Sequence, residues 1–388
     1  MDFSLGEHVE AFRDEVRAFL DEHLPSEVVE RAHATGTMHD WDFHRALAGR
    51  GWIAASWPEE FGGQARDPLE MAVLMEELYR AGAPVDGLGI AMMVAHTLRL
   101  FGSEEQRRDV LPRILSGDVI PCLGYSEPDA GSDVAAVSTR AVRDGDEWVI
   151  DGQKAFTTLA HEAQYVFLLT RTNPDVAKHR GLTLFLVPLD SEGIEIHPIE
   201  TLGGERTNMT FYSGVRVPDS ARVGEVDGGW SVMLAALSFE RNSLNLGEPG
   251  RLVERAVTWA SEPREGDGRR PIEDPRVRAR LARAALDQHV ARLLGYRSAW
   301  VAAHGDLPHV EGSMAKLWTT ESFTRTASDF VDLLGPDGVL AHGVEGAPAG
   351  GWIEHAFRHS QVTTIYGGSS EIQRKIIAEQ GLGLPRSG

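Results

Sequence analysis

The residues most able to do chemistry are an adjacent glutamate and arginine, Glu240 and Arg241, in the segment LSFERN. The glutamate belongs to a set spaced by four, three and four residues, which is one stripe of an α-helix: Met233, Leu237, Glu240 and Leu244. The other members are apolar, so the stripe should face the interior, where glutamate is rare without a function. A carboxylate whose pKa is raised there from about 4.3 toward neutrality suits a general base. The alternative is a structural ion pair with Arg241 at the edge of a helix bundle.

A second chemical pattern lies near the C-terminus, in TTIYGGSSEIQR, residues 363–374. Two glycines, Gly367 and Gly368, precede Ser370 and Gln373, which have the spacing of a capping box. Three isoleucines then give the following helix an apolar face: Ile372, Ile376 and Ile377. We therefore expect a glycine turn followed by a helix that Ser370 caps.

Common nucleotide and metal motifs are missing from the sequence. It contains no G-x-G-x-x-G after a strand and no G-x-x-x-x-G-K-[ST]. The HEAQY segment at His161 lacks the second histidine of a zinc motif, and Cys122 is the one cysteine. We therefore expect no metal site, no disulfide and a reducing, cytoplasmic environment.

The composition is that of a globular protein with a strongly acidic surface. The 388 residues are 42% apolar and 25% charged, with a formal net charge of −20. Such a charge disfavours nucleic acid and anionic lipid as partners, although a local cluster of cations could still bind an anionic small molecule. The N-terminal segment is predicted to be an amphipathic helix, and the longest apolar runs are only strand length, so we expect no membrane contact.

Helical and strand patterns divide the chain into three segments that must position these residues. Residues 1–119 have apolar positions three and four apart, as a helical domain requires. Residues 120–229 contain short runs of branched and aromatic residues bounded by turns, which predicts a mostly antiparallel β domain. Residues 230–388 return to long helical periodicity, so the overall class is α+β with the order helical, β, helical.

Four motifs occur in this context and in a fixed order along the chain. They are GYSEPDAGSD (residues 124–133), DGQKAFTT (151–158), GVRVP (214–218) and IYGGSSEIQR (365–374). Together they resemble the acyl-CoA dehydrogenase family over essentially the whole chain. The resemblance implies an N-terminal helical domain, a central antiparallel β domain and a C-terminal four-helix bundle, with FAD bound between them.

The resemblance also implies a reaction, α,β-dehydrogenation of an acyl-CoA thioester to the trans-2-enoyl-CoA. A carboxylate removes the α-proton while the β-hydrogen leaves as hydride to flavin N5. Many members carry this base directly after the tyrosine of the last motif, where this chain has Gly367. Some members with glycine there take the base instead from the first helix of the C-terminal domain, where it directly precedes an arginine. By this resemblance Glu240 is the base, and Arg241 shapes its surroundings and tunes its pKa.

Cofactor and substrate contacts are likewise implied position by position. The residues expected at FAD are Tyr125, Ser126, Ser132, Phe156, Thr158, Ser369 and Glu371. Phe156 stands where many members have a tryptophan against the flavin ring, and Thr158 is the expected partner of flavin N5. The residues expected at the acyl-CoA are Ser132, Tyr366 and Gly367. Ordinary turn chemistry is the alternative explanation for the Gly and Ser residues in these loops.

The sequence departs from the family where members reach across a subunit interface to a neighbouring FAD. The R-x-x-F-G-x-P-I element reads REGDGRRPI, with Glu265 at the arginine position, Gly268 at the phenylalanine position and Arg269 or Arg270 as possible substitutes. In a second element, members usually have a glutamine before a Gly-Gly pair. Here that element reads DLLGPDG, with Asp332 and Pro336 as the differing residues. These departures resemble actinobacterial members, some of which form α2β2 heterotetramers acting on steroid side-chain thioesters.

Several alternatives stay open on the sequence alone. The chain could form a homotetramer or an α2β2 heterotetramer with a related chain, and pass its electrons to electron-transfer flavoprotein. It could instead be a half-site or non-catalytic subunit, or a flavin-dependent oxidase. The substrate could be a fatty acyl or a steroid acyl thioester.

Overall fold

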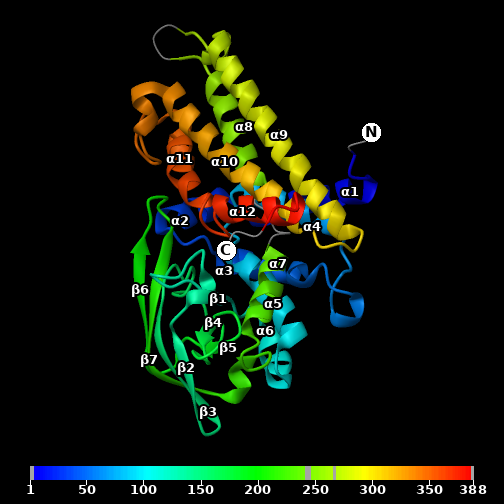
Figure 1. Ribbon diagram of the computed structural model, residues 1–388. Helices are drawn as coiled ribbons and strands as arrows, with labels where there is room; N and C mark the ends of the chain where they lie inside the picture. The colour runs from blue at the N-terminus through cyan, green and yellow to red at the C-terminus, as the bar shows by residue number, and fades with distance from the viewer. Residues whose placement is uncertain (1–3, 241–245, 265–267, 386–388) are drawn as a thin grey trace.

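A computed structural model describes residues 4–240, 246–264 and 268–385, apart from the side chains of 238–240. Its helices and strands follow the predicted helical, β, helical order along the chain (Figure 1). The N-terminal helices are α1 (Glu7–His23), α2 (Ser26–Thr35), α3 (Trp41–Gly49), α4 (Pro68–Ala81), α5 (Asp86–Phe101) and α6 (Leu111–Leu115). The later helices are α7 (Gly229–Glu240), α8 (Gly247–Ser261), α9 (Pro275–Ala303), α10 (His309–Leu334), α11 (Trp352–Thr363) and α12 (Ser370–Ile376).

The central unit is one sheet that is mainly antiparallel, as the sequence predicts. Its strands are β1 (Pro121–Gly124), β2 (Arg140–Asp144), β3 (Glu147–Lys154), β4 (Tyr165–Arg171), β5 (Leu182–Pro188), β6 (Ile194–Glu200), β7 (Arg206–Pro218) and β8 (Arg222–Val223). The order is β6-β7-β3-β2-β4-β5-β8, and β1 pairs in parallel with β4. The long β7 pairs with both β3 and β6, so it fixes where those two strands end.

Local signals explain why particular helices begin where they do. At the start of α4, the Asp67 side chain accepts hydrogen bonds from the amides of Leu69 and Glu70, and the Glu70 carboxylate accepts one from the Asp67 amide. These reciprocal bonds form a capping box, and Pro68 occupies the first helical position. Asp274 also caps α9, where its side chain accepts from the Arg276 amide, again before a proline. Such caps satisfy amides that the first helical turn leaves unpaired.

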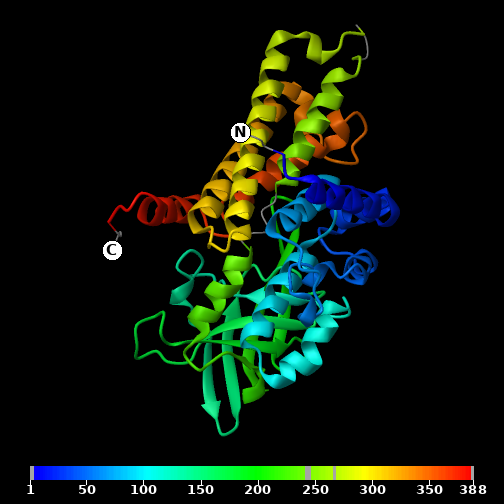
Figure 2. The same cartoon turned by 90° about the vertical axis from the view of Figure 1, so that its right-hand side faces the viewer.

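Two hydrophobic cores hold the helical parts. One contains residues of α1, α3, α4, α5 and α7 with strands β4 and β5, so α5 and α7 pack against the sheet. Another lies among α8, α9, α10 and α11, the helices of the C-terminal bundle. Figure 2 shows the bundle at one end of the molecule and the sheet at the other, with α4 and α5 between them.

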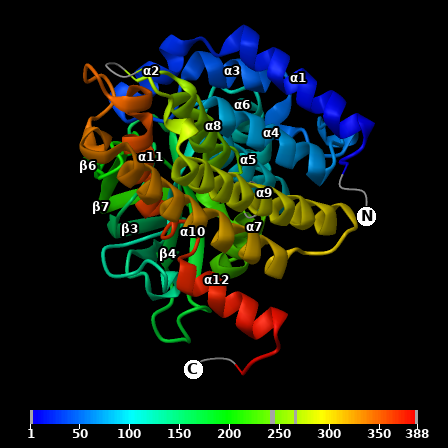
Figure 3. The ribbon, with the colours of Figure 1, turned by 90° about the horizontal axis from the view of Figure 1, so that it is seen from above.

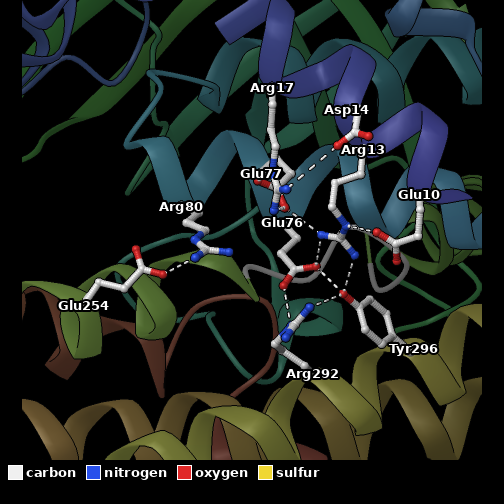
Figure 4. Close-up of polar contacts among 10 residues, drawn as sticks. All are labelled: Glu10, Arg13, Asp14, Arg17, Glu76, Glu77, Arg80, Glu254, Arg292 and Tyr296. Carbon is white, nitrogen blue, oxygen red and sulfur yellow. Dashed lines mark hydrogen bonds and ion pairs between the residues drawn. The ribbon is translucent and has the colours of Figure 1, made fainter. Parts of the chain in front are cut away.

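A buried ion network ties the N-terminal helices to the bundle (Figure 4). Arg13 of α1 lies 2.6 Å from a Glu77 oxygen and 3.1 Å from a Glu76 oxygen, both on α4. Glu76 also lies 2.6 Å from Arg292 of α9, and Tyr296 donates to it. The side chain of Glu76 is 2% exposed, so this carboxylate joins three helices away from water. None of the helices in the described parts of the chain has the length and apolar character that crossing a membrane needs.

The glycine turn near the C-terminus forms as expected, but its helix is capped by a different residue. Gly367 and Gly368 have φ of 62° and 89°, a region that L side chains rarely adopt. The N-cap of α12 is Ser369, whose hydroxyl accepts from the Ile372 amide, whereas Ser370 is buried inside the first turn. The prediction that Ser370 caps the helix is therefore wrong by one residue, because Gln373 turns back and donates to the carbonyls of both glycines.

Candidate active site

One wall of the candidate site is the segment that follows β3. Beyond Lys154 the chain leaves the sheet, and Phe156 adopts a φ of 58° with its ring 64% exposed. Asn208 fixes the backbone of Thr157 through two hydrogen bonds. The Thr157 amide donates to the Asn208 carbonyl, and the Thr157 carbonyl accepts from the Asn208 side chain. The hydroxyl of Thr158 lies 3.2 Å from that of Thr207. The fold thus fixes the backbone here while presenting an aromatic face to the outside.

The loop after β1 lies directly beside this segment. The Ala155 amide donates to the Ser126 carbonyl at 2.9 Å, which joins GYSEPDAGSD to DGQKAFTT. Ser126 is half-buried, and the ring of Tyr125 is buried with its centroid 6.2 Å from that of Phe167. The structure therefore brings together Tyr125, Ser126, Phe156 and Thr158, as the motifs predict. Ser132 lies farther along the same loop and is exposed.

The C-terminal motif contributes a second exposed apolar surface. Ile365 and Tyr366 are 65% and 48% exposed, which is unusual for large apolar side chains. Lys316 of α10 holds the turn beneath them by donating to the carbonyls of Thr363 and Gly368. The left-handed φ of Gly367 would strain any residue with a side chain, so this position is better suited to glycine than to a catalytic glutamate.

The predicted base lies at the edge of what the structure describes. Helix α7 ends at Glu240, and the two described members of its stripe face inward as expected, since Met233 is 1% exposed and Leu237 packs against the core. The side chain of Glu240, all of Arg241 and Leu244 lie outside the described residues. The roles of Glu240 and Arg241 stay predictions.

A cluster that sequence reasoning missed lies where the sheet, α8 and α11 meet. Glu205, in the turn between β6 and β7, lies 2.6 Å from Nδ1 of His359, whose Nε2 lies 3.5 Å from Glu248. Burial alone would lower the pKa of His359, but Glu248 and Glu205 raise it well above its usual value. Burial raises the pKa of Asp86 to about 7, and Glu205 adds to that effect. Burial of the Tyr366 hydroxyl, followed by the nearby charge of Glu248, raises the pKa of Tyr366 above its usual value.

No sequence signal foretold this cluster, because its members come from three distant segments. The turn carrying Glu205 is placed by α2 and α11: the Arg206 amide donates to the Gly36 carbonyl, and Arg358 donates to the Leu202 carbonyl. His355 and His359 share one face of α11, but nothing in the sequence relates that face to Glu205 or Glu248. In the described parts of the chain, no group of three or more metal-ligating side chains is arranged to hold a metal ion.

The remaining predicted residues lie on other elements of the fold. Ser369 and Glu371 begin α12, which projects from the body of the molecule in Figure 2 and Figure 3. Gly268, Arg269 and Arg270 lie exposed in the α8–α9 connection, at the far end of the bundle from the sheet (Figure 1), while Glu265 lies outside the described residues.

The arrangement fits a flavin at the wall after β3. The aromatic ring of Phe156 is mostly exposed, and backbone polar groups and the Thr158 hydroxyl lie beside it. A planar, partly polar ring system could stack on the aromatic ring and form hydrogen bonds with these polar groups. A Rossmann unit is not needed for this, since the polar groups come from the segments that follow β1 and β3.

Comparison with known proteins decides the family. Models of the acyl-CoA dehydrogenase N-terminal, middle and C-terminal domains match residues 6–118, 122–213 and 227–382. The acyl-CoA dehydrogenase FadE26 of Mycobacterium tuberculosis is 39% identical over 87% of this chain and 86% of its own length. This chain belongs to the acyl-CoA dehydrogenase family. The human mitochondrial short-chain specific acyl-CoA dehydrogenase is 33% identical over 86% of this chain and 81% of its own length.

Solved structures of acyl-CoA dehydrogenases agree over the full chain. The structure titled Tcur3481-Tcur3483 steroid ACAD has a TM-score of 0.91 and 38% identity, and covers 100% of both chains. The ChsE4-ChsE5 complex from Mycobacterium tuberculosis has a TM-score of 0.89 and 34% identity, again over 100% of both chains. The predicted acyl-CoA dehydrogenase fold and the predicted class of enzyme are thereby confirmed.

Proposed function

We propose that this acyl-CoA dehydrogenase carries out FAD-dependent α,β-dehydrogenation of an acyl-CoA thioester to the trans-2-enoyl-CoA. The observation that carries the proposal is the convergence of two family motifs just beyond the ends of β1 and β3, where the Ala155 amide donates to the Ser126 carbonyl next to the exposed Phe156. FAD, when bound there, would supply the hydride acceptor. The family match over all three domains supports the same conclusion.

The residues of this chain would divide the work as follows. Phe156 stacks on the ring system, while Thr158 and the backbone of Tyr125 and Ser126 provide polar contacts. Glu240 takes the α-proton onto its carboxylate, and Arg241 shapes the pocket around it. Ser132, Tyr366 and Gly367 contact the thioester, with Ser369 and Glu371 of the projecting α12 reaching the adenosine end of FAD. Exclusion of water strengthens each of these interactions, because the thioester α-carbon is a weak acid.

We further propose that the chain pairs with a related chain in an α2β2 heterotetramer rather than forming a homotetramer. Two observations favour pairing: the family arginine is replaced in REGDGRRPI, and two similar solved structures carry two chain names in their titles. The similarity to the Tcur3481-Tcur3483 steroid ACAD also favours a steroid acyl thioester over a simple fatty acyl group as the substrate. Electron-transfer flavoprotein is the proposed acceptor, and a cytoplasmic location stays a prediction.

The experiment that tests the activity mixes the FAD-loaded protein with linear, branched and steroidal acyl-CoAs without oxygen. Loss of the visible flavin absorbance with at least one of them is expected. If no acyl-CoA bleaches the flavin, the proposed dehydrogenase activity is wrong, and a non-catalytic subunit is the better description. Rapid oxygen consumption in air would favour the oxidase alternative.

A further inference from the structure

Two opposite charges that the proposed chemistry does not use are buried behind the flavin wall. Lys154, the last residue of β3, is 0% exposed, and Glu127 of GYSEPDAGSD is 6% exposed. Lysine and glutamate are almost never buried this completely unless they are paired. We propose that Lys154 and Glu127 are positioning residues that lock the two FAD-contacting segments together, a role that rests on the proposed function.

The Lys154 side chain reaches the first of these segments directly. Its Nζ lies 2.8 Å from Glu127 Oε1 and donates to the Tyr125 carbonyl at 3.2 Å. The backbone adds a parallel bond one residue on, from the Ala155 amide to the Ser126 carbonyl. Lys154 and Ala155, the two residues just before Phe156, therefore fix the backbone of Tyr125 and Ser126.

Glu127 in turn attaches the loop to the start of β2. Its Oε2 accepts from the amide and hydroxyl of Ser138 at 2.7 and 2.8 Å, and its Oε1 accepts from the Thr139 amide at 2.8 Å. With Lys154 this gives four donors on one buried carboxylate, which uses all of its lone-pair directions. These four hydrogen bonds restrict the orientation of the Glu127 carboxylate, and they therefore also restrict the conformation of the loop that carries it.

The charges of the pair are consistent with this arrangement. Burial alone would raise the pKa of Glu127, but Lys154 and the hydrogen bonds hold it at about 2. Burial lowers the pKa of Lys154 to about 8 against the opposing effect of Glu127. Removing one member would leave the other as an unpaired buried charge, which is strongly destabilising, so a single substitution alone cannot separate positioning from stability.

The chain offers a matched surface pair as a control. Lys178 Nζ lies 2.6 Å from Asp133 Oδ2, near the same loop, but both side chains are about half exposed. Exposed pairs contribute little to stability or geometry. Lys178→Met therefore removes an ion pair of the same chemical type without touching the backbone of the flavin wall.

The test compares wild type, Lys154→Met, Lys178→Met and the double variant Glu127→Gln/Lys154→Met, each as the full chain with any partner that co-purifies. The double variant removes both charges together, so it should recover most of the thermal stability that Lys154→Met loses. FAD affinity by titration of the apoprotein, the visible spectrum of bound flavin and thermal unfolding of the apoprotein are measured. Lys178→Met should match wild type in all three.

We expect the double variant to bind FAD at least tenfold more weakly and with an altered flavin spectrum, because the bond to the Tyr125 carbonyl is still missing. If its FAD affinity and spectrum return to wild type together with its stability, the pair is only structural and the inference is wrong. If the wild-type protein binds no FAD even when it is co-expressed with a related acyl-CoA dehydrogenase chain, the proposed function fails instead. The two failures are therefore distinguishable.

Discussion

The residue that links sequence to cofactor most directly is Phe156. It combines a left-handed backbone, which is rare for an aromatic residue, with a ring that is mostly exposed. The neighbouring Thr157 is held in place by two hydrogen bonds, one from its amide to the Asn208 carbonyl and one from the Asn208 side chain to its carbonyl, so the fold imposes the strain. Strain that is maintained in this way is usually associated with function.

Phe156→Ala should weaken FAD binding by about tenfold, since a stacked aromatic pair contributes about 0.5–1.5 kcal/mol beyond its buried area. Stability of the apoprotein should be nearly unchanged, because the ring packs against little else. Titration with FAD and thermal unfolding of the apoprotein measure both effects. A large loss of stability with unchanged FAD affinity would show that the ring is a core residue.

Motifs allowed these single residues to be predicted, but not the charged pairs behind them. Tyr125, Ser126 and Phe156 were expected at the flavin, and the structure brings their segments together. Glu127 and Lys154 lie in the same two motifs, yet their pairing depends on how β3 passes the loop after β1. His359 and Glu205 are 154 positions apart, and no local pattern relates them.

At the scale of elements, ionic contacts fix how helices cross between the domains. Arg13, Glu76 and Arg292 join α1, α4 and α9, and His359 joins α11 to α8 and to the turn after β6. Periodicity predicted the helices and strands well, because it reflects which face is buried. The cap of α12 was missed, since Ser369 and Ser370 are equally good caps locally and the buried Gln373 decides between them.

Arg13→Ala should destabilise the protein by about 3 kcal/mol, because it leaves Glu76 and Glu77 as incompletely paired buried carboxylates. Arg17→Ala, one turn along the same helix, is the control. Arg17 also bonds Glu77 but is half exposed, so its loss should cost no more than about 1 kcal/mol. Urea unfolding of both variants decides the matter, and equal losses would contradict a special role for Arg13.

The His359 contacts predict a definite pH dependence. Because Glu248 and Glu205 raise the pKa of His359 in the folded protein, the imidazolium stabilises it fully below the ordinary pKa of about 6.5. That contribution should disappear as the pH rises through the folded-state pKa. The stability gap between wild type and His359→Asn, from urea unfolding at several pH values, should therefore shrink at high pH. A gap that widens as the pH rises would overturn the assignment.

At the scale of the molecule, the chain has the acyl-CoA dehydrogenase fold, with its N-terminal, middle and C-terminal domains. The described residues of the α8–α9 connection lie at the far end of the bundle from the sheet (Figure 1), and the role of this connection toward a neighbouring chain stays a prediction. The domain bounds 1–119, 120–229 and 230–388 stay predictions, and the assembly could not be derived from one sequence because the partner's residues are not in it.

If the heterotetramer is correct, this chain purified alone should contain well below one FAD per chain. Co-expression with a related acyl-CoA dehydrogenase chain that carries the family arginine should raise FAD toward one per complete site. Flavin absorbance and native mass of the purified proteins measure this. A homotetramer with one FAD in every chain would contradict the pairing.

The proposed dehydrogenation requires Glu240 to act as the base on the side of the substrate opposite the flavin. The direct measurement is the anaerobic loss of flavin absorbance after mixing an acyl-CoA with FAD-loaded wild type and Glu240→Gln, each with any partner chain that co-purifies. Wild type should bleach, and Glu240→Gln should keep its FAD but fail to bleach. Bleaching of Glu240→Gln at the wild-type rate would contradict the central claim.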